Sequence, residues 1–305
     1  MAGRLRDRLK QVVRRYLLPP KMQIWSIGMY VGESVFRFHA YEQANNPVLT
    51  REDVSDVKAV FVADPFMLAV GDIWYMFFEV MDSETGKGRI GLASSKDRMK
   101  WTYHQIVLAE PFHLSYPYVF EFDGDYYMIP ETYEAGSVRL YKASRFPTQW
   151  SFFKTLLSGQ YFVDTSIFRY DNKWWLYTDT SPAMKHNTLS LYYADGLTGP
   201  WVEHPKSPII QRNAHMARPA GRVTVLNDRI IRYTQDCIPN YGTQVLAFEV
   251  DELSVRQYHE RRAAVDAVLT ASGAGWNASG AHHLDPHAIG DGRWIACVDG
   301  FYWGV

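Results

Sequence analysis

The stretch Ala63–Glu79, ADPFMLAVGDIWYMFFE, contains an apolar run, a Gly-Asp turn and a second run rich in aromatic residues. The same pattern returns as SYPYVFEFDGDYYMIPE (Ser115–Glu131) and VDTSIFRYDNKWWLYTD (Val163–Asp179). Two weaker copies follow, ARPAGRVTVLNDRIIRYTQ from Ala217 and LDPHAIGDGRWIACVD from Leu284. The copies lie about 50 to 70 residues apart, a spacing beyond that of single helices or hairpins and typical of propeller or solenoid repeats. The chain is therefore predicted to be a repeat protein.

Each repeat continues with a second pair of predicted strands. The segments 88–111, 136–159 and 187–210 share an apolar strand, a polar turn, a Trp and another apolar strand. Four strands per unit make a propeller blade, so five units predict an all-β, five-bladed β-propeller. The last repeat lacks this second half, but residues 25–49 resemble it closely. We therefore expect N-terminal strands to complete the last blade and close the ring, which removes exposed sheet edges.

Composition supports a single large domain over residues 21–305. Of the 305 residues, 47% are hydrophobic and 15% are aromatic, which supplies ample apolar surface for one core. The formal net charge of -1 gives no electrostatic reason to expect nucleic-acid binding. The sequence has no long apolar run and no apolar export signal, so a cytoplasmic protein is expected.

Residues 1–20 differ from the repeats and are expected to form a short basic amphipathic helix and a linker. Within residues 3–18 the apolar side chains share one helical face, which Arg and Lys side chains surround. The pair Pro19-Pro20 ends this pattern. Such a helix either packs on the propeller or a neighbouring domain, or attaches to an anionic membrane surface. The second alternative would place the protein peripherally at the inner face of the membrane.

Propeller geometry brings residues that are distant in the sequence to one face of the ring. The innermost strands of all blades run in the same direction, so their first residues gather at one mouth of the central funnel. The predicted openers of these strands are Asp64, Tyr116, Asp164, Arg218 and Asp285. The second strands return to the same face and end in a second acidic layer, Glu79, Glu131, Asp179, Asp236 and Asp299. The loops that lead into the funnel carry His113, His215, His282 and His283.

This convergence predicts acid/base chemistry on a polar substrate, because pairs of carboxyl groups are the working parts of most glycosidases. We expect the catalytic residues to be Asp64, Asp164 and Glu131. The expected substrate-binding residues are Glu79, His113, Tyr116, His215, Arg218, His283 and Asp285. For each acidic residue the alternative is a structural role, in which it caps a turn or braces adjacent blades.

A metal site is the less favoured interpretation of the string HHLDPH, His282–His287. Residues two apart share one face of a strand, so His283, Asp285 and His287 could point together. The spacing nevertheless matches no recognised zinc pattern. Neither a metal nor another cofactor is expected, and hydrogen bonding to a sugar is the preferred role.

Two motifs and the aromatic strands carry a resemblance to a known fold family. ADPF at Ala63–Phe66, VDTSIF at Val163–Phe168 and the GDYYM and NKWWLY strands resemble the five-bladed propellers of glycoside hydrolase family 43. The resemblance implies a base at Asp64 and an orienting role for Asp164. The Glu that serves as the acid in that family would open blade four, where this chain has Arg218. The resemblance leaves the acid to Glu131, Glu79 or a histidine such as His283.

Longer strings carry a closer resemblance that covers most of the chain. WSIGMYVGES from Trp25, EPFHLSYPYVFE from Glu110, IPETYEAGSVRLY from Ile129 and HHLDPH look like the N-terminal propeller domain of plant glucosamine inositolphosphorylceramide transferases and their bacterial relatives. This resemblance implies a propeller fold and a role in carbohydrate metabolism. It implies an oligosaccharide, a polysaccharide or a glycolipid as the partner.

Two functions follow from these observations. The preferred one is a glycosidase that acts on O-glycosyl bonds, or a related glycan-processing enzyme, with paired carboxyl groups in the funnel. The alternative is a non-catalytic glycan-binding or scaffold propeller in a polysaccharide or glycolipid biosynthesis pathway, which the arginine at blade four favours. The feature that distinguishes the two is whether Asp64 and a second carboxyl group lie at catalytic separation with one pKa raised.

Overall fold

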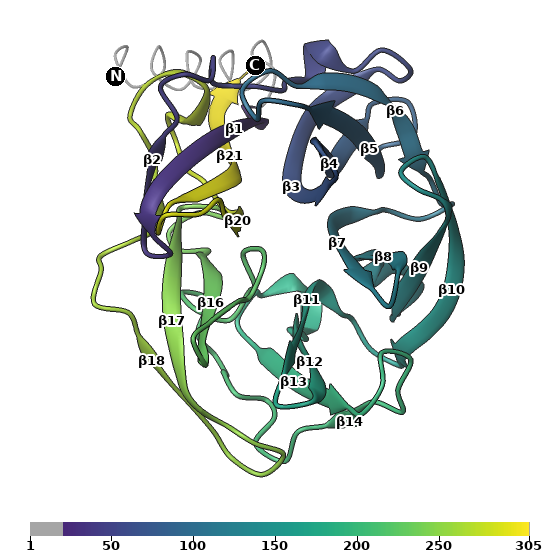
Figure 1. Ribbon diagram of the computed structural model, residues 1–305, viewed down its shortest axis with the longest axis vertical. Coiled ribbons are helices and arrows are strands. Elements are labelled where there is room, and N and C mark those ends of the chain that lie inside the picture. Colours follow the sequence, from purple (N-terminus) through teal and green to yellow (C-terminus); the bar gives the residue numbers. More distant parts are fainter. Residues whose placement is uncertain (1–20, 305) are drawn as a thin grey trace, which may run out of the picture.

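The computed structural model describes residues 21–304 and consists almost entirely of β-strands arranged around a central axis (Figure 1). In chain order the strands are β1 (Met22–Ser34), β2 (Arg37–Ala40), β3 (Ala59–Val70), β4 (Ile73–Asp82), β5 (Lys87–Ser95), β6 (Thr102–Leu108), β7 (Ser115–Phe122), β8 (Asp125–Glu131), β9 (Ser137–Arg145), β10 (Gln149–Ser158), β11 (Val163–Tyr170), β12 (Lys173–Asp179), β13 (Leu189–Ala194), β14 (Val202–Glu203), β15 (Thr224–Leu226), β16 (Arg229–Asp236), β17 (Gln244–Leu253), β18 (Tyr258–Arg262), β19 (Leu269–Thr270), β20 (Leu284–Ala288) and β21 (Trp294–Gly304). Short 3-10 helices in this part of the chain are η1 (Arg51–Asp53), η2 (Tyr133–Ala135), η3 (Pro182–Met184) and η4 (Gly275–Asn277). None of the helices in residues 21–304 is long and apolar enough to cross a bilayer.

The strands form five sheets, which confirms the predicted all-β, five-bladed propeller. From the axis outward, blades one to three have the orders β3-β4-β5-β6, β7-β8-β9-β10 and β11-β12-β13-β14. Blade four has the order β15-β16-β17-β18, and the short β19 also pairs with β17. Each innermost strand belongs to one of the repeats found in the sequence.

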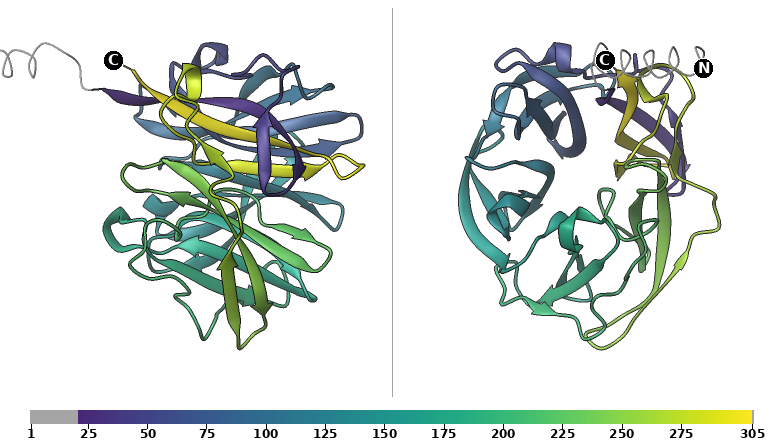
Figure 2. Two further views of the ribbon diagram at one scale, coloured as in Figure 1. Left: turned by 90° about the vertical axis from the view of Figure 1, so that its left-hand side faces the viewer. Right: turned by 180° about the vertical axis from the view of Figure 1, so that it is seen from behind.

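Blade five joins strands from both ends of the described chain. Its order is β20-β21-β1-β2. The ladder between β1 and β21 is antiparallel and runs without a register shift from Met22 opposite Gly304 to Gly32 opposite Trp294. In the left view of Figure 2 these two strands, purple and yellow, lie side by side and extend beyond the body of the propeller. The helix predicted within residues 1–20 lies outside the described residues.

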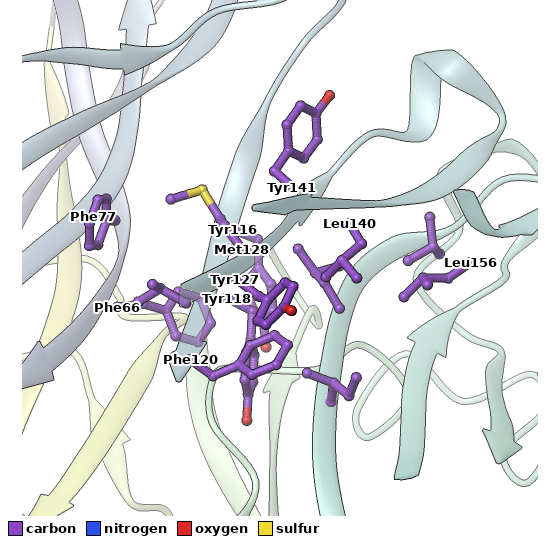
Figure 3. Close-up of a cluster of buried hydrophobic side chains, with 14 of the residues drawn as sticks. Phe66, Phe77, Tyr116, Tyr118, Phe120, Tyr127, Met128, Leu140, Tyr141 and Leu156 are labelled. Carbon is purple, nitrogen blue, oxygen red and sulfur yellow. The ribbon is translucent and has the colours of Figure 1, made fainter. Parts of the chain in front are cut away.

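Aromatic side chains of the innermost strands pack between neighbouring blades (Figure 3). The ring of Phe66 on β3 meets the ring of Tyr116 on β7 edge to face, with centroids 4.9 Å apart, and the ring of Tyr118 at 5.0 Å. Such pairs contribute about 0.5 to 1.5 kcal/mol each beyond the burial of their surface. This packing fixes the starts of β3 and β7, and therefore the first residues of the funnel mouth, relative to each other.

A backbone irregularity recurs at the predicted openers of blades one to three, which are the sixth residue of β3 and the second residues of β7 and β11. Asp64, Tyr116 and Asp164 have positive φ angles of 52°, 47° and 49°. At each of them the pairing with the second strand shifts register, in blade one between Ala63 and Phe66. Non-glycine residues are uncommon in this region, and β-bulges of this kind re-aim side chains and concentrate near functional sites.

The openers predicted for blades four and five do not occupy the equivalent position. Arg218 lies before β15. Its carbonyl oxygen accepts the backbone N–H of Gln235 at 2.9 Å. The segment before β15 approaches blade five so closely that a Cβ on Gly221 would lie 1.9 Å from the carbonyl oxygen of Leu284, and only glycine fits there. In blade five, Asp285 is the second residue of β20 and lies opposite Cys297, two residues before Asp299 on β21.

Candidate functional site

The predicted acidic residues meet at the face where the innermost strands begin and the second strands end. Glu79, Glu131 and Asp179 lie at this end of β4, β8 and β12, opposite the residues that precede the three bulges. The exposed fractions are 4% for Asp64, 5% for Glu79, 4% for Glu131 and 1% for Asp164. A carboxyl group buried to this extent must be paired, hydrogen-bonded or protonated.

Asp64 is surrounded by two histidines and a second carboxyl group from blade five. Its backbone N–H donates to Oδ2 of Asp299 at 3.0 Å. Its own Oδ1 lies 3.8 Å from Nε2 of His282 and 3.7 Å from Nδ1 of His283. Asp299 also accepts the backbone N–H groups of both histidines and lies 2.7 Å from Nδ1 of His282. Asp299 therefore fixes the two histidines of blade five against Asp64 of blade one.

Burial and neighbouring charges shift the pKa values of Asp64, His282 and His283 in different directions. Burial, together with the negative charges of Asp164 and Asp299, raises the pKa of Asp64 to about 7, although His282 opposes the shift. Burial lowers the pKa of His282, but the neighbouring carboxylates outweigh it and the net shift is upward. Burial lowers the pKa of His283 to about 4. Near neutral pH, His283 is therefore neutral, whereas Asp64 is close to its midpoint.

Asp164 is held by a buried ion pair. Its Oδ2 accepts the Nε–H of Arg218 at 2.6 Å and an Nε2–H of Gln235 at 2.8 Å. Nη1 of Arg218 lies 2.8 Å from Nδ1 of His186, and Nη2 lies 3.7 Å from Oε2 of Glu131. Arg218 is 7% exposed, so this pair is almost completely desolvated and its geometry is fixed.

Glu131 and Glu79 have the properties of proton donors. Burial and then the negative charge of Asp164 raise the pKa of Glu131 well above its usual range. Glu131 also accepts the backbone N–H of Asp164 at 3.3 Å. Burial and then the charge of Asp64 raise the pKa of Glu79 in the same direction. The Oε1 of Glu79 lies 3.5 Å from Nε2 of His113, whose own pKa burial lowers.

Four carboxyl oxygens of this cluster have no hydrogen-bond partner among residues 21–304. They are Oδ1 of Asp64, Oδ1 of Asp164, Oδ2 of Asp179 and Oε1 of Glu79. Nearly all buried polar atoms in native proteins have a partner, so such atoms mark a place that a ligand or ordered water fills. The cluster can therefore accept the hydroxyl groups of a polar ligand and exchange protons with it near neutral pH.

A metal ion fits this cluster poorly. Asp64, His282 and Asp299 each offer an atom within 4.8 Å of the others. However, the oxygens of Asp299 already accept three backbone N–H groups and lie beside Nδ1 of His282. The remaining donors are too few for a closed four-ligand site.

Tyr116 lies inside the ring and joins three blades. Its hydroxyl group lies 2.8 Å from Oγ of Ser166 and donates to the carbonyl oxygen of Gly221 at 3.0 Å. Its side chain is completely buried. These contacts are structural, and they leave no atom of Tyr116 for a substrate.

Asp285 likewise lies on the axis and away from the mouth. Its Oδ1 accepts the Nε–H of Arg222 at 2.5 Å, and its Oδ2 lies 2.8 Å from Nε2 of His287. Arg222 also donates to the carbonyl oxygen of Val119 at 3.0 Å, so the pair links blades two, four and five. These contacts give the completely buried Asp285 a structural role, whereas the substrate-binding role stays a prediction.

His215 and His113 lie at the mouth, as the sequence predicts. His215 is exposed, and its Nδ1 lies 2.9 Å from Oδ1 of Asp236. His113 is half-buried next to Glu79, and its Nδ1 accepts the backbone N–H of Gly88 at 3.0 Å. Binding of a substrate by either histidine stays a prediction.

Sequence reasoning did not single out three residues that complete the site, His186, Gln235 and Tyr241. The ring of Tyr241 lies 4.9 Å from the guanidinium group of Arg218 and 5.0 Å from the ring of His282, so it connects the two halves of the cluster. His186 and Tyr241 lie in equivalent loops, between the second and third strands of blades three and four. The sequence feature that could have identified Gln235 is its position directly before Asp236, the acidic residue that ends β16.

The fold defines a five-bladed propeller of the type found in glycoside hydrolases. The family 117 glycoside hydrolase Zg3597 of Zobellia galactanivorans has a similar structure, with a TM-score of 0.56 and 13% identity over 91% of this chain and 90% of that chain. The α-L-arabinanase of Cellvibrio cellulosa has a TM-score of 0.57 and 12% identity over 83% of this chain and 95% of that one. Identities this low show a shared fold and nothing further.

The sequence assigns the chain to a particular family. Residues 21–301 match the family described as glucosamine inositolphosphorylceramide transferase 1, N-terminal, and the chain belongs to this family. Glucosamine inositolphosphorylceramide transferase 1 of Oryza sativa subsp. japonica is 33% identical over 303 residues, covering 93% of this chain and 41% of that protein. The Arabidopsis thaliana protein of the same name is 34% identical over 298 residues, covering 90% and 39%. The chain thus spans about two fifths of the length of these relatives.

Proposed function

We propose that this propeller is a glycan-processing enzyme domain, which cleaves or transfers an O-glycosyl bond at the mouth of its funnel. The observation that carries the proposal is the combination of two buried carboxyl groups of one cluster: the pKa of Asp64 is about 7, and burial and then the charge of Asp164 raise the pKa of Glu131 well above its usual range. Glycosidases need one carboxyl group that is deprotonated and one that is protonated at the working pH. The names of the relatives and the fold of the structural neighbours support a carbohydrate substrate.

In this proposal Asp64 and Glu131 transfer the protons, and Asp164 is a positioning residue that acts through Glu131. Asp64 takes a proton from water or from an acceptor hydroxyl group as that oxygen bonds to the anomeric carbon. Glu131 gives its proton to the glycosidic oxygen as the bond between that oxygen and the anomeric carbon breaks. Asp164, fixed by Arg218, raises the pKa of Glu131 and keeps its proton available.

A screen of the 305-residue protein against oligosaccharides, glycolipids and chromogenic glycosides tests this function, with product formation and thermal shift read together. The Asp64→Asn variant should bind the glycan that gives a hit but lose at least about a hundredfold in kcat. Asp171→Asn is the matched control, because Asp171 is exposed in the turn between β11 and β12 at the other end of the blade. Equal turnover by Asp64→Asn and the control would exclude the proposed role of Asp64.

A second candidate function is glycan recognition without turnover. It is favoured by Arg218, which stands where the glycoside hydrolase resemblance leads us to expect the acid and neutralises Asp164. It is also favoured by the small exposed fraction of every carboxyl group in the cluster. A glycan that shifts the melting temperature of the wild type and of Asp64→Asn equally, with no product from either, would establish this function instead.

A further inference from the structure

The mouth of the propeller is divided by charge. We define the basic rim as the mouth-side segments of blades three to five: residues 21–23, 159–162, 180–188, 211–217, 237–243, 271–283 and 300–304. These segments contain no Asp or Glu, and their exposed Lys and Arg side chains are Lys21, Lys185 and Arg212. By contrast, the mouth loops of blades one and two expose five acidic residues, Glu52, Asp53, Asp56, Glu84 and Glu134, against one exposed cation, Lys58. Opposite charges therefore face solvent on the two sides of one funnel.

The basic rim also exposes large apolar side chains. They are Met22, Tyr161, Met184, Ile238, Tyr302 and Trp303, with exposed fractions from 37% to 54%. Single exposed apolar residues are ordinary on a protein surface, but a group that gathers on one face marks a contact surface. These residues come from three blades and share the face on which the funnel opens.

Contacts between the loops make the basic rim one continuous surface. The backbone N–H of Cys237 donates to the carbonyl oxygen of Ala214 at 2.9 Å. The Nε2–H of Gln23 donates to the carbonyl oxygen of Tyr241 at 3.1 Å. The ring of Tyr241 also contacts the ring of His186, with centroids 5.6 Å apart. Segments from blades three, four and five therefore hold each other in place around the mouth.

Both ends of the described chain lie at this surface. Met22 pairs with Gly304 at the end of the ladder between β1 and β21. The left view of Figure 2 shows this end projecting on the side opposite the turn between β20 and β21. The sequence before Lys21 contains six Arg or Lys residues and one Asp. Residues 1–20 adjoin this end in the sequence.

We propose that the basic rim docks on an anionic lipid surface, so that the funnel opens toward the lipid head groups. Exposed aromatic and aliphatic side chains among cations, with no carboxylate between them, are what binding to an anionic membrane interface requires. The acidic loops of blades one and two are repelled by such a surface, so the propeller rests on it tilted toward blades three to five. This docking does not depend on whether the funnel cleaves, transfers or only binds a glycan.

Co-sedimentation of the full chain with vesicles at low salt tests the proposal. The wild type should bind phosphatidylcholine vesicles that contain phosphatidylserine, and bind pure phosphatidylcholine much less. The double variants Lys185→Glu with Arg212→Glu and Ile238→Ser with Trp303→Ser should each weaken binding at least about tenfold, because each cation and each buried apolar side chain contributes separately.

Matched controls lie away from the rim, on the outer strand β10 of blade two and, for Lys100, in the turn between β5 and β6 of blade one. Phe152→Ser with Phe153→Ser removes side chains that are 50% and 47% exposed, and Lys100→Glu with Lys154→Glu reverses charges away from the rim. Both controls should bind as the wild type does. The proposal is overturned if the wild type does not bind the vesicles or if the rim variants bind as well as the controls. It is also overturned if light scattering shows that the wild type is a dimer and that the rim variants are monomers. Unchanged melting temperatures show that all variants are folded.

Discussion

The Nε–H of Arg218 donates to Oδ2 of Asp164 at 2.6 Å in a place where both side chains are almost closed to solvent. Removal of one member of a buried ion pair leaves the other charge without compensation. We expect Arg218→Gln to lower the free energy of unfolding by about 3 to 5 kcal/mol, measured by urea denaturation. Adding Asp164→Asn to Arg218→Gln should restore part of this loss.

A surface ion pair provides the control for the substitutions at Arg218 and Asp164. Arg261 contacts Asp251 and is 53% exposed in its side chain. Arg261→Gln should therefore cost less than about 1 kcal/mol. If Arg218→Gln costs no more than Arg261→Gln, the ion pair of Asp164 is not desolvated as described.

The raised pKa of Asp64 predicts a dependence of stability on pH. A carboxyl group whose pKa is higher when folded binds more protons in the folded state, so stability declines as the pH rises from its ordinary value of 3.8 to about 7. Asp64→Asn removes this decline. The variant should be more stable than the wild type above pH 7 by on the order of 1 to 3 kcal/mol, and the two should converge in acid. Thermal melting across this pH range measures the difference.

Asp285 predicts the opposite dependence. Burial alone would raise its pKa, but Arg222 and His287 outweigh burial and hold the pKa well below its usual range. The stability that this carboxylate contributes is present above the unfolded pKa and is lost as the pH falls through the folded value. Asp285→Asn should therefore be less stable than the wild type by about 3 to 5 kcal/mol at neutral pH, with a smaller difference in acid. A constant difference between the two proteins at all pH values would contradict this account of the axial ion pair.

Tyr116→Phe tests whether Tyr116 is structural. The variant loses the hydroxyl contacts with Ser166 and Gly221 and should be less stable by about 1 to 3 kcal/mol. Tyr161→Phe, which changes an exposed tyrosine, should have no measurable effect on stability. The kcat and KM of folded Tyr116→Phe should equal those of the wild type. A raised KM with unchanged stability would instead assign Tyr116 to the substrate.

The proposed mechanism predicts how the rate depends on pH. The rate should rise through about pH 7 as Asp64 loses its proton, and fall at higher pH as Glu131 loses its own. Asp164→Asn removes a negative charge beside Glu131 and should move the alkaline limb to lower pH. Retention of the wild-type alkaline limb in Asp164→Asn would remove Asp164 from the mechanism.

The repeats of the sequence were sufficient to predict the blades and the convergence of Asp64, Asp164, Glu79 and Glu131. The reason is that these residues belong to the two innermost strands of regular blades, where the position in the repeat determines the position in space. The repeat also placed Asp299 correctly in the second acidic layer, although its role in orienting His282 and His283 was not foreseen.

The rest of the site depends on features that have no simple sequence signal. The segment before β15 is extended because Gly221 packs on Leu284, and this brings Arg218 toward Asp164. His186 and Tyr241 lie in loops whose conformations follow from their contacts with other blades. Asp285 was expected at the mouth because the last repeat was aligned on it, whereas the structure places it on the axis.

The ladder between β1 and β21 also constrains how the molecule is assembled. During synthesis β1 leaves the ribosome first, yet its long-range partner is the last strand of the domain, so blade five cannot form until residue 304 has emerged. Contacts between such distant parts of a chain slow folding. Until the circle is complete, the first strand presents an unpaired edge, and a chaperone that covers this edge should increase the yield of native protein.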